Sequence, residues 1–309
     1  MKYSVIVPVY NEEANIASLH RDIVSTMEKL HAPFEIIFIN DGSSDNTQKV
    51  LETLSPVTVI TMRKNFGQTA AMDAGIKQAT GEIIITLDGD GQNPPSEIPK
   101  LLEVMEHKGV DIVSGWRKKR RDPFLKRFVS RGAYGLRSIF VKDQIHDSGC
   151  SLKAYKRFCF DGIDLYGEMH RFIPAMLSWS GFTVSEVPIE HRERVHGVSK
   201  YNWRRVIKGF IDMLFIWFWR KYAARPLHLL GMLSIVLGTG GIALALWVFI
   251  RRVILQISLA NSTMPMISLF CIVLAGQFFV SGLILDVVMK QYYGNSNKRY
   301  YSIRSVTQR

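Results

Sequence analysis

Short apolar segments alternate with amphipathic segments over the first 115 residues of the chain. Five segments rich in Val, Ile and Phe predict β-strands at residues 4–8, 35–40, 57–62, 82–87 and 111–114. Between them, apolar positions recur at helical spacing, which predicts helices at about 12–30, 45–54, 67–79 and 96–108. Strands that alternate with helices are typical of βαβ units. We therefore expect an α/β domain with a mostly parallel sheet.

Two longer apolar runs occupy the last third of the chain. Residues 226–250 form a run of 25 positions and residues 264–285 a run of 22, with no Asp, Glu, Lys or Arg in either. A helix needs about 20 apolar residues to cross a bilayer, so both runs are long enough. A pair of buried core helices is the alternative, but two runs of this length are rare in soluble proteins. We expect a transmembrane hairpin at residues 226–289, with helices at 226–250 and 264–288.

Basic residues predict the orientation of this hairpin. Six Lys and Arg side chains lie between positions 204 and 225 and five between 290 and 309, whereas the connecting loop has only Arg251 and Arg252. Because basic flanks stay in the cytoplasm, both ends of the hairpin are expected there. The apolar run at residues 4–10 is too short for a signal peptide. We expect a multi-pass protein of the inner (plasma) membrane, with residues 1–202 and a tail at 290–309 in the cytoplasm.

The net charge of +12 is compatible with a nucleic acid or an anionic membrane surface as partner. The predicted hairpin makes anionic membrane lipids the simpler partner, so we expect no nucleic-acid binding. Residues 203–225 agree with this, because Trp and Phe side chains there are bracketed by Arg and Lys. That composition is typical of an amphipathic helix lying at the bilayer interface.

A second basic segment extends from residue 117 to residue 131, with eight basic side chains and one acidic one. It is either a solvated or nucleic-acid-binding patch or a membrane-facing site. The apolar side chains among the charges favour the membrane; they are Phe124, Leu125, Phe128 and Val129. Since arginine binds phosphate bidentately, the candidates for a lipid phosphate are Arg117, Arg127 and Arg131.

Polar loops follow three of the predicted strands, at residues 8–12, 40–45 and 88–92. The carboxyl ends of parallel strands share one edge of a sheet, and ligands bind there. Asp88 and Asp90 follow a buried strand, where an isolated carboxylate is costly. A divalent cation holding a diphosphate would offset that cost. Alone, an Asp-x-Asp pattern is a weak sign of a metal, but three such loops together are a stronger one.

The first two loops have more than one interpretation. At residues 40–45, Ser44 or Asp45 could cap the following helix by accepting backbone N–H groups. Asp41 stands at the strand end, where it could accept a hydrogen bond from a nucleotide base or ribose. Pro8 and Tyr10 either line a base pocket or pack in the interior.

These loops carry a resemblance to a known family. The segments VPVYNEE (7–13), NDGSSD (40–45) and DGDGQNPP (88–95) resemble family 2 glycosyltransferases of the GT-A fold. More narrowly, they resemble the dolichyl-phosphate mannosyltransferase and bacterial polyprenyl-phosphate glycosyltransferase branch. The likeness continues through RKNFG (63–67), DSG (147–149) and RVHGVSKY (194–201) and includes a two-helix membrane anchor. It implies a GT-A, Rossmann-like nucleotide-sugar-binding domain at residues 1–202.

The resemblance implies roles for individual residues. The implied ligands of Mg²⁺ or Mn²⁺ are Asp88, Asp90 and Gln92. The implied contacts of the nucleotide-sugar donor are Pro8, Tyr10, Glu12, Asp41 and Asp88. The expected catalytic set is Asp90, Asp147, Arg117, Arg127, Arg131 and Lys200. Gly89 departs from the family pattern, since many relatives have alanine or another small residue there.

Within the catalytic set, Asp147 is expected to orient the sugar or assist the acceptor. Lys200 would neutralise the departing diphosphate, although a surface lysine near a membrane is the alternative. Glu168 could pair with Arg171 instead of acting as a base.

The resemblance and the hairpin together predict a membrane-bound inverting glycosyltransferase. It would move one sugar from a nucleotide diphosphate sugar, with UDP favoured, to a polyprenyl phosphate on the cytoplasmic face, with undecaprenyl favoured over dolichyl. A phosphate monoester has a second pKa of about 6 and is largely dianionic at neutral pH. Such an acceptor needs no general base to remove its proton.

Two other classes fit parts of the sequence. A processive polysaccharide synthase shares the early loops, but this chain has no Gln-x-x-Arg-Trp motif and two spans make a poor channel. A non-catalytic nucleotide-sugar-binding partner of a lipid-sugar flippase is disfavoured by the complete metal set. The sugar, the choice between Mg²⁺ and Mn²⁺, and homo-oligomer formation through residues 238–241 are left open.

Overall fold

The computed structural model describes residues 1–117, 145–165, 167–192, 225–256 and 262–295, with a few isolated positions outside these ranges. The chain divides into two compact units, Met1–Leu214 and Phe215–Tyr301. Most of the expected interfacial helix at 203–225 lies outside the described residues, as do the candidate site residues Arg127, Arg131 and Lys200.

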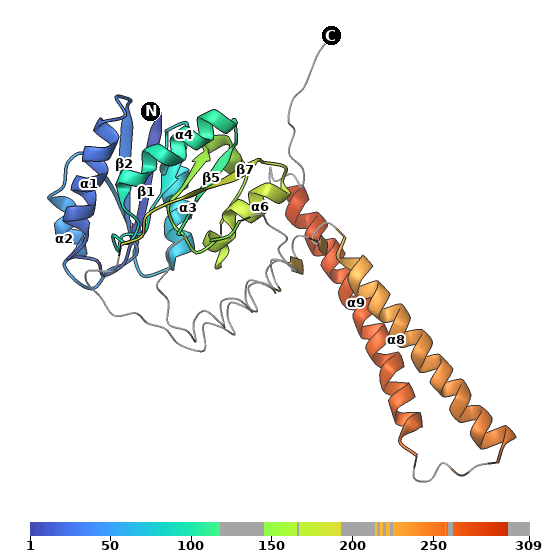
Figure 1. Cartoon of the computed structure of the whole chain (residues 1–309). Helices are drawn as coiled ribbons and strands as arrows, with labels where there is room; N and C mark the ends of the chain where they lie inside the picture. Colours follow the sequence, from blue (N-terminus) through green and yellow to red (C-terminus); the bar gives the residue numbers. More distant parts are fainter. Residues whose placement is uncertain are drawn as a thin grey trace. The chain divides into compact units, whose positions relative to one another are not determined.

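The first unit is built around a seven-stranded sheet (Figure 1). Its strands are β1 (Tyr3–Val9), β2 (Phe34–Asn40), β3 (Thr58–Thr61), β4 (Ile83–Thr86), β5 (Ile112–Trp116), β6 (Lys153–Lys156) and β7 (Val184–Pro188). Its helices are α1 (Ile16–Glu28), α2 (Thr47–Glu52), α3 (Gln68–Gln78), α4 (Ile98–Lys108) and α6 (Ile173–Trp179). Short 3₁₀ turns are found at Pro95–Glu97, Arg157–Phe160 and Met169–Arg171.

The strand order is β3-β2-β1-β4-β6-β5-β7. Strand β1 pairs in parallel with β2 and β4, β2 with β3, and β5 with β7. Strand β6 is antiparallel to both of its neighbours, β4 and β5. Its amino end therefore lies at the same edge of the sheet as the carboxyl ends of β1, β2, β4 and β5. We call this edge the carboxyl edge.

Side-chain alternation along the strands separates two hydrophobic cores. On β1, Val5 and Val7 pack with α1, α2 and α4, whereas Ile6 packs with α3 and α6 on the opposite face of the sheet. All three side chains are fully buried. Burying an aliphatic side chain of this kind contributes about 1.5–3 kcal/mol. The two layers of helices thus hold the sheet firmly beneath the loops of its carboxyl edge.

The predicted alternation of strands and helices is confirmed. The five predicted strands correspond to β1–β5 within two residues at each end, and the four predicted helices correspond to α1–α4. The sequence does not predict β6, β7 or α6. Strand β6 has four residues with lysine at both ends, so its own pattern is weakly apolar. It is buried because it pairs with two strands that are distant along the chain.

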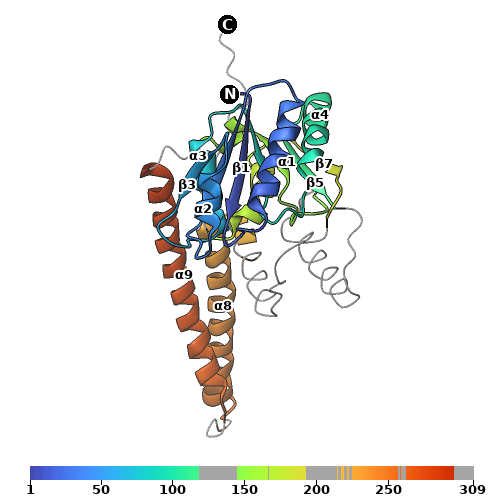
Figure 2. The same cartoon turned by 90° about the vertical axis from the view of Figure 1, so that its left-hand side faces the viewer.

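The second unit is a helical hairpin of α8 (Pro226–Phe249), a π-helical turn (Ile250–Ile254) and α9 (Met264–Asn295). Helices α8 and α9 lie side by side in both views (Figures 1 and 2). Ser268 Oγ donates to the Gly241 carbonyl oxygen (2.8 Å), and a Cβ on Gly241 would stand 2.9 Å from Ile272 Cγ1. Small residues of this kind let membrane helices approach closely. Gly241 therefore serves the contact between α8 and α9 of the same chain. Homo-oligomer formation stays untested.

Two segments, Pro226–Ile254 and Met264–Gln291, are long and apolar enough to cross a membrane. Only 6% and 17% of their most apolar windows are buried, so these are not the enclosed core helices of a soluble protein. Exposed apolar surface on this scale indicates association with a membrane.

Candidate active site

Three loops of the carboxyl edge are neighbours because β2, β1 and β4 are adjacent parallel strands. The first two loops bind each other. The Asn11 N–H donates to Ser43 Oγ (3.0 Å), and the Ser44 N–H donates to Asn11 Oδ1 (2.8 Å). Asp45, and not Ser44, accepts the N–H of Thr47 at the start of α2 (3.0 Å). The expected gathering of the three loops at one edge is confirmed.

Asp41 joins a fourth loop, residues 63–67, to the three loops of the carboxyl edge. Its side chain is buried, and its two carboxylate oxygens accept the N–H groups of Phe66 (2.7 Å) and Gly67 (2.9 Å). Gly42 lies so close to the same loop that a Cβ there would stand 2.4 Å from the carbonyl carbon of Lys64. The carboxylate thus fixes residues 63–67 immediately before α3. A contact between Asp41 and a nucleotide stays a prediction.

The other expected donor contacts lie on or beside β1. Pro8 is buried within the strand, and Glu12 Oε2 accepts a hydrogen bond from Asn15 Nδ2 (2.6 Å). Tyr10 is 44% exposed just beyond the strand. Of these expected contacts, Tyr10 presents the largest surface to a ligand.

Asp88 follows β4 and is held from two sides. Its N–H donates to Ser151 Oγ (3.0 Å), and Gln68 Nε2 donates to its Oδ1 (2.7 Å). Burial, together with the nearby charge of Asp90, raises the pKa of Asp88 above its ordinary value. Asp90 Oδ1 in turn accepts the Gln92 N–H (3.1 Å). Two crowded carboxylates ionise together most readily when a cation lies beside them.

The residue types here fit a divalent cation. Asp88, Asp90 and the amide oxygen of Gln92 offer the oxygen ligands that Mg²⁺ and Mn²⁺ prefer. Among the described residues, no group of three or more His, Cys, Asp or Glu side chains could hold a metal. A metal bound by Asp88 and Asp90 therefore needs further oxygen ligands in addition to these two carboxylates. Gly89 permits the turn, because a Cβ there would stand 2.6 Å from Val9 Cγ1.

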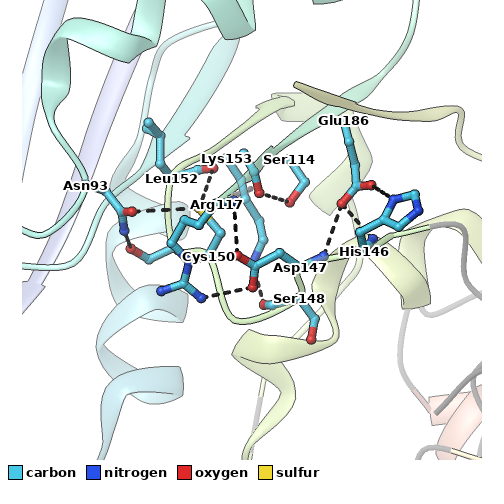
Figure 3. Close-up of polar contacts among 12 residues, drawn as sticks. Asn93, Ser114, Arg117, His146, Asp147, Ser148, Cys150, Leu152, Lys153 and Glu186 are labelled. Carbon is cyan, nitrogen blue, oxygen red and sulfur yellow. Dashed lines mark hydrogen bonds and ion pairs between the residues drawn. The ribbon is translucent and has the colours of Figure 1, made fainter. Parts of the chain in front are cut away.

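Arg117 and Asp147 form a buried ion pair at the carboxyl edge (Figure 3). Arg117 Nε donates to Asp147 Oδ2 (2.7 Å) and Nη2 donates to Oδ1 (2.9 Å), and the two side chains are 8% and 9% exposed. Burial by itself would lower the pKa of Arg117, but the hydrogen bond and charge of Asp147 outweigh it and raise that pKa. Sequence reasoning gives these residues separate roles, and the structure brings them into direct contact.

Glu186 on β7 holds the loop that carries Asp147 (Figure 3). Its Oε1 accepts the N–H groups of His146 (2.9 Å) and Asp147 (3.3 Å), and its Oε2 lies 2.7 Å from His146 Nδ1. The Trp116 ring stacks on the His146 ring with centroids 4.7 Å apart. Sequence reasoning missed Glu186, because no motif links β7 to a loop some 40 positions earlier.

A cavity of about 150 Å³ lies at the carboxyl end of β4, and we call it the β4 cavity. Its polar lining residues include Gln68, Asp88, Lys153 and His170. Lys153 is 3% exposed and donates through Nζ to the Ser148 carbonyl oxygen (3.3 Å). His170 Nδ1 lies 2.7 Å from Thr69 Oγ1. Sequence reasoning missed both lining residues, although strand alternation places Lys153 on the same face as the buried Tyr155.

The sequence profile of Glycosyl transferase family 2 matches residues 4–163, more than half of the chain. The chain belongs to this family. The match includes the carboxylate pair and the Arg117–Asp147 ion pair. The likeness to this family inferred from the loop motifs is therefore confirmed, and the protein is a glycosyltransferase.

Two relatives match the glycosyltransferase over nearly its full length. Dodecaprenyl-phosphate galacturonate synthase of Rhizobium johnstonii is 33% identical over 99% of this chain and 93% of its own length. Undecaprenyl-phosphate 4-deoxy-4-formamido-L-arabinose transferase of Proteus mirabilis is 31% identical over 99% of this chain and 94% of its own length. The narrower likeness to polyprenyl-phosphate glycosyltransferases is therefore confirmed.

The glycosyltransferase also resembles solved structures. Glucosyl-3-phosphoglycerate synthase from Mycobacterium tuberculosis, crystallised with Mn²⁺ and UDP-glucose, superimposes with a TM-score of 0.57. The match covers 71% of this chain and 78% of that protein at 17% sequence identity. An identity this low establishes the fold alone, which is the expected GT-A fold.

His170 should make the stability of the glycosyltransferase sensitive to acid. Burial, and then the charges of Arg171 and Lys153, lower the pKa of His170 to about 3. Since the unfolded value is near 6.5, the stabilisation is complete above pH 6.5 and is lost as the pH falls towards 3. From pH 7 to pH 5 the free energy of unfolding should decrease by about 2 kcal/mol through this group.

Thermal unfolding of the detergent-solubilised protein at several pH values measures this effect. The variant His170→Gln should flatten the decline, whereas His107→Gln at the exposed end of α4 should keep the wild-type slope. An unchanged slope in His170→Gln would contradict the assignment.

Proposed function

We propose that this glycosyltransferase moves one sugar from a nucleotide diphosphate sugar, with UDP favoured, to a polyprenyl phosphate, with inversion at the anomeric carbon. The observation that carries the proposal is the Asp88–Asp90 carboxylate pair beside the β4 cavity. The two membrane-length helices support a lipid acceptor. The printed names of both full-length relatives, a dodecaprenyl-phosphate synthase and an undecaprenyl-phosphate transferase, support the same acceptor class.

Asp88, Asp90 and Gln92 would hold Mg²⁺ or Mn²⁺. When bound, such an ion supplies positive charge against the diphosphate that departs with the nucleotide. The GT-A neighbour crystallised with Mn²⁺ and UDP-glucose supports this class of donor and metal. Pro8 at the end of β1 and the loop residues Tyr10, Glu12 and Asp41 would surround the nucleotide.

Arg117 binds the acceptor phosphate, and Asp147 keeps its guanidinium in place. Nε and Nη2 of Arg117 face Asp147, so Nη1 is the nitrogen that a phosphate oxygen would reach. A dianionic phosphate attacks the anomeric carbon without losing a proton, so Asp147 acts by position and not as a base. Arg127 and Arg131 would bind the same phosphate, and Lys200 would neutralise the departing diphosphate; all three lie outside the described residues.

The hairpin anchors the enzyme in the inner (plasma) membrane as a multi-pass protein, with the catalytic unit in the cytoplasm. Eleven basic side chains flank the hairpin on one side, against two in its connecting loop, which supports this orientation. The same flanks would bind anionic lipids.

A donor panel tests the proposed function. Full-length protein in detergent, with Mn²⁺ or Mg²⁺ and undecaprenyl phosphate, is given each common UDP- and GDP-sugar, and lipid-linked product is detected by mass spectrometry. One donor should give a product carrying a single sugar. Products with several sugars would indicate a processive synthase. Nucleotide binding without product from any donor would overturn the proposal in favour of a non-catalytic binding role.

A further inference from the structure

The β4 cavity has room for one sugar ring. A protein cavity of about 150 Å³ is known to accept a single six-membered ring such as benzene. The volume of the β4 cavity is also about 150 Å³, so a single ring can enter it. Its walls carry carboxylate, ammonium, amide and imidazole groups as well as apolar side chains such as Met72. Convergent polar groups of this kind suit a ligand rich in hydroxyls.

The cavity reaches one carboxylate of the Asp88–Asp90 pair. Asp88 lines it, and Gln68, another lining residue, donates to Asp88 Oδ1 at 2.7 Å. In a nucleotide diphosphate sugar, the sugar ring is bonded directly to the outer phosphate. A diphosphate held at Asp88 and Asp90 therefore brings its sugar to the mouth of this cavity. This step rests on the proposed function.

His170 is fixed in the wall of the cavity by a buried hydroxyl. It lies in the turn Met169–Arg171, and its Nδ1 is 2.7 Å from Oγ1 of Thr69, which is 3% exposed in the first turn of α3. Because Thr69 occupies Nδ1, Nε2 is the ring nitrogen available to a ligand. A sugar hydroxyl both donates and accepts, so it can pair with Nε2 in either tautomer of the neutral ring.

A merely structural role for His170 is the alternative, in which its bond to Thr69 only joins the turn to α3. The two roles differ in one measurable respect. If His170 is only structural, its loss should change the affinity for a nucleotide diphosphate equally with and without the attached sugar. If His170 contacts the sugar, its loss should change only the affinity for the sugar-bearing nucleotide.

We infer that His170, held by Thr69 in the wall of the β4 cavity, is a specificity-determining residue that hydrogen-bonds a hydroxyl of the donor's sugar ring. The inference deepens the proposed function by naming the residue that would contact the sugar. It also assigns a role to a residue outside the segment matched by the family profile.

Calorimetric titration of the full-length protein in detergent with Mn²⁺ tests this. The probes are UDP, UDP-glucose, UDP-N-acetylglucosamine, UDP-glucuronate, GDP and GDP-mannose. The wild-type protein should bind one sugar-bearing probe more tightly than the matching nucleotide diphosphate. His170→Asn keeps an amide near the position of Nδ1 and removes the group at Nε2. The His170→Asn variant should bind that sugar-bearing probe about tenfold more weakly than the wild type does. Its affinity for the parent nucleotide diphosphate should change less than twofold.

Matched variants separate sugar contact from folding. His170→Gln places an amide near Nε2 and should retain most of the affinity that His170→Asn loses. Thr69→Ser keeps the hydroxyl and should behave as wild type, whereas Thr69→Val should resemble His170→Asn. Melting temperatures establish that each variant is folded.

Equal losses for UDP and its sugar, or no loss for either, would overturn the inference while leaving the proposed function intact. The inference would also be overturned if the wild-type protein bound no sugar-bearing probe more tightly than the matching nucleotide diphosphate. Failure of every nucleotide to bind would remove the proposed function itself, and the inference with it.

Discussion

Asp90→Asn is expected to reduce metal-dependent sugar transfer by roughly a hundredfold to a thousandfold, and Asp88→Asn by a similar factor. Each substitution removes one of the two negative charges that follow β4 and preserves the size of the side chain. The remaining carboxylate would hold a divalent ion weakly, so the departing diphosphate would lose the positive charge beside it. The measurement is the initial rate of lipid-linked sugar formation over a range of Mn²⁺ concentrations.

Thermal unfolding gives an independent measurement of the same site. A ligand at 100 times its dissociation constant stabilises the folded state by about 2.7 kcal/mol. Mn²⁺ with UDP should therefore raise the melting temperature of the wild-type protein and leave that of Asp90→Asn nearly unchanged. The control is Asp161→Asn in an exposed turn, which should retain the wild-type rate and the wild-type response to Mn²⁺. Full metal-dependent turnover by Asp90→Asn would exclude this residue as a ligand.

The second large effect is expected at the Arg117–Asp147 ion pair. Asp147→Ala leaves a guanidinium group that is only 8% exposed without its carboxylate, and breaking a buried pair in this way costs about 3–5 kcal/mol. For a unit of this size the melting temperature should fall by about 10 °C. The double variant Arg117→Met/Asp147→Ala should recover part of that loss, because it removes the unpaired charge. Transfer should remain low in both variants, since each lacks a correctly held Arg117.

An exposed ion pair provides the control for this prediction. Arg192 and Asp22 are 3.4 Å apart with side chains 57% and 51% exposed, and such pairs contribute less than about 1 kcal/mol. Asp22→Ala should therefore melt within a few degrees of wild type. Wild-type stability in Asp147→Ala would contradict the buried pair. A stable Asp147→Asn protein that binds donor and acceptor as the wild type does and yet transfers no sugar would show a direct chemical role for Asp147.

Local patterns account for what the sequence predicts correctly. The runs that become β1 and β2 are apolar along their whole length because helices cover both faces of the sheet. The ends of parallel strands must meet at one edge, so Asp41 and Asp88 could be placed near each other without any structure. The membrane-length helices are equally local, since length and composition alone identify them.

Pairings between distant segments account for what the sequence does not predict. Strand β6 joins the sheet in the antiparallel sense, and this brings Asp147 to Arg117 and Lys153 to the β4 cavity. Thr69 and His170 are 101 positions apart, and neither belongs to a recognisable motif. Asp41 shows a further limit of prediction from the sequence. Its position at a strand end was predictable, but its two backbone partners depend on how residues 63–67 fold back onto it.

The antiparallel position of β6 has an evolutionary consequence. Because β6 is antiparallel to β5, Arg117 directly after β5 lies beside Asp147 ahead of β6, and two hydrogen bonds join their side chains. The two residues are separated by 29 positions of the chain. A change of either residue alone leaves a buried charge without its partner, which is costly. Natural selection should therefore keep or replace the two residues together, so that they are inherited as one unit.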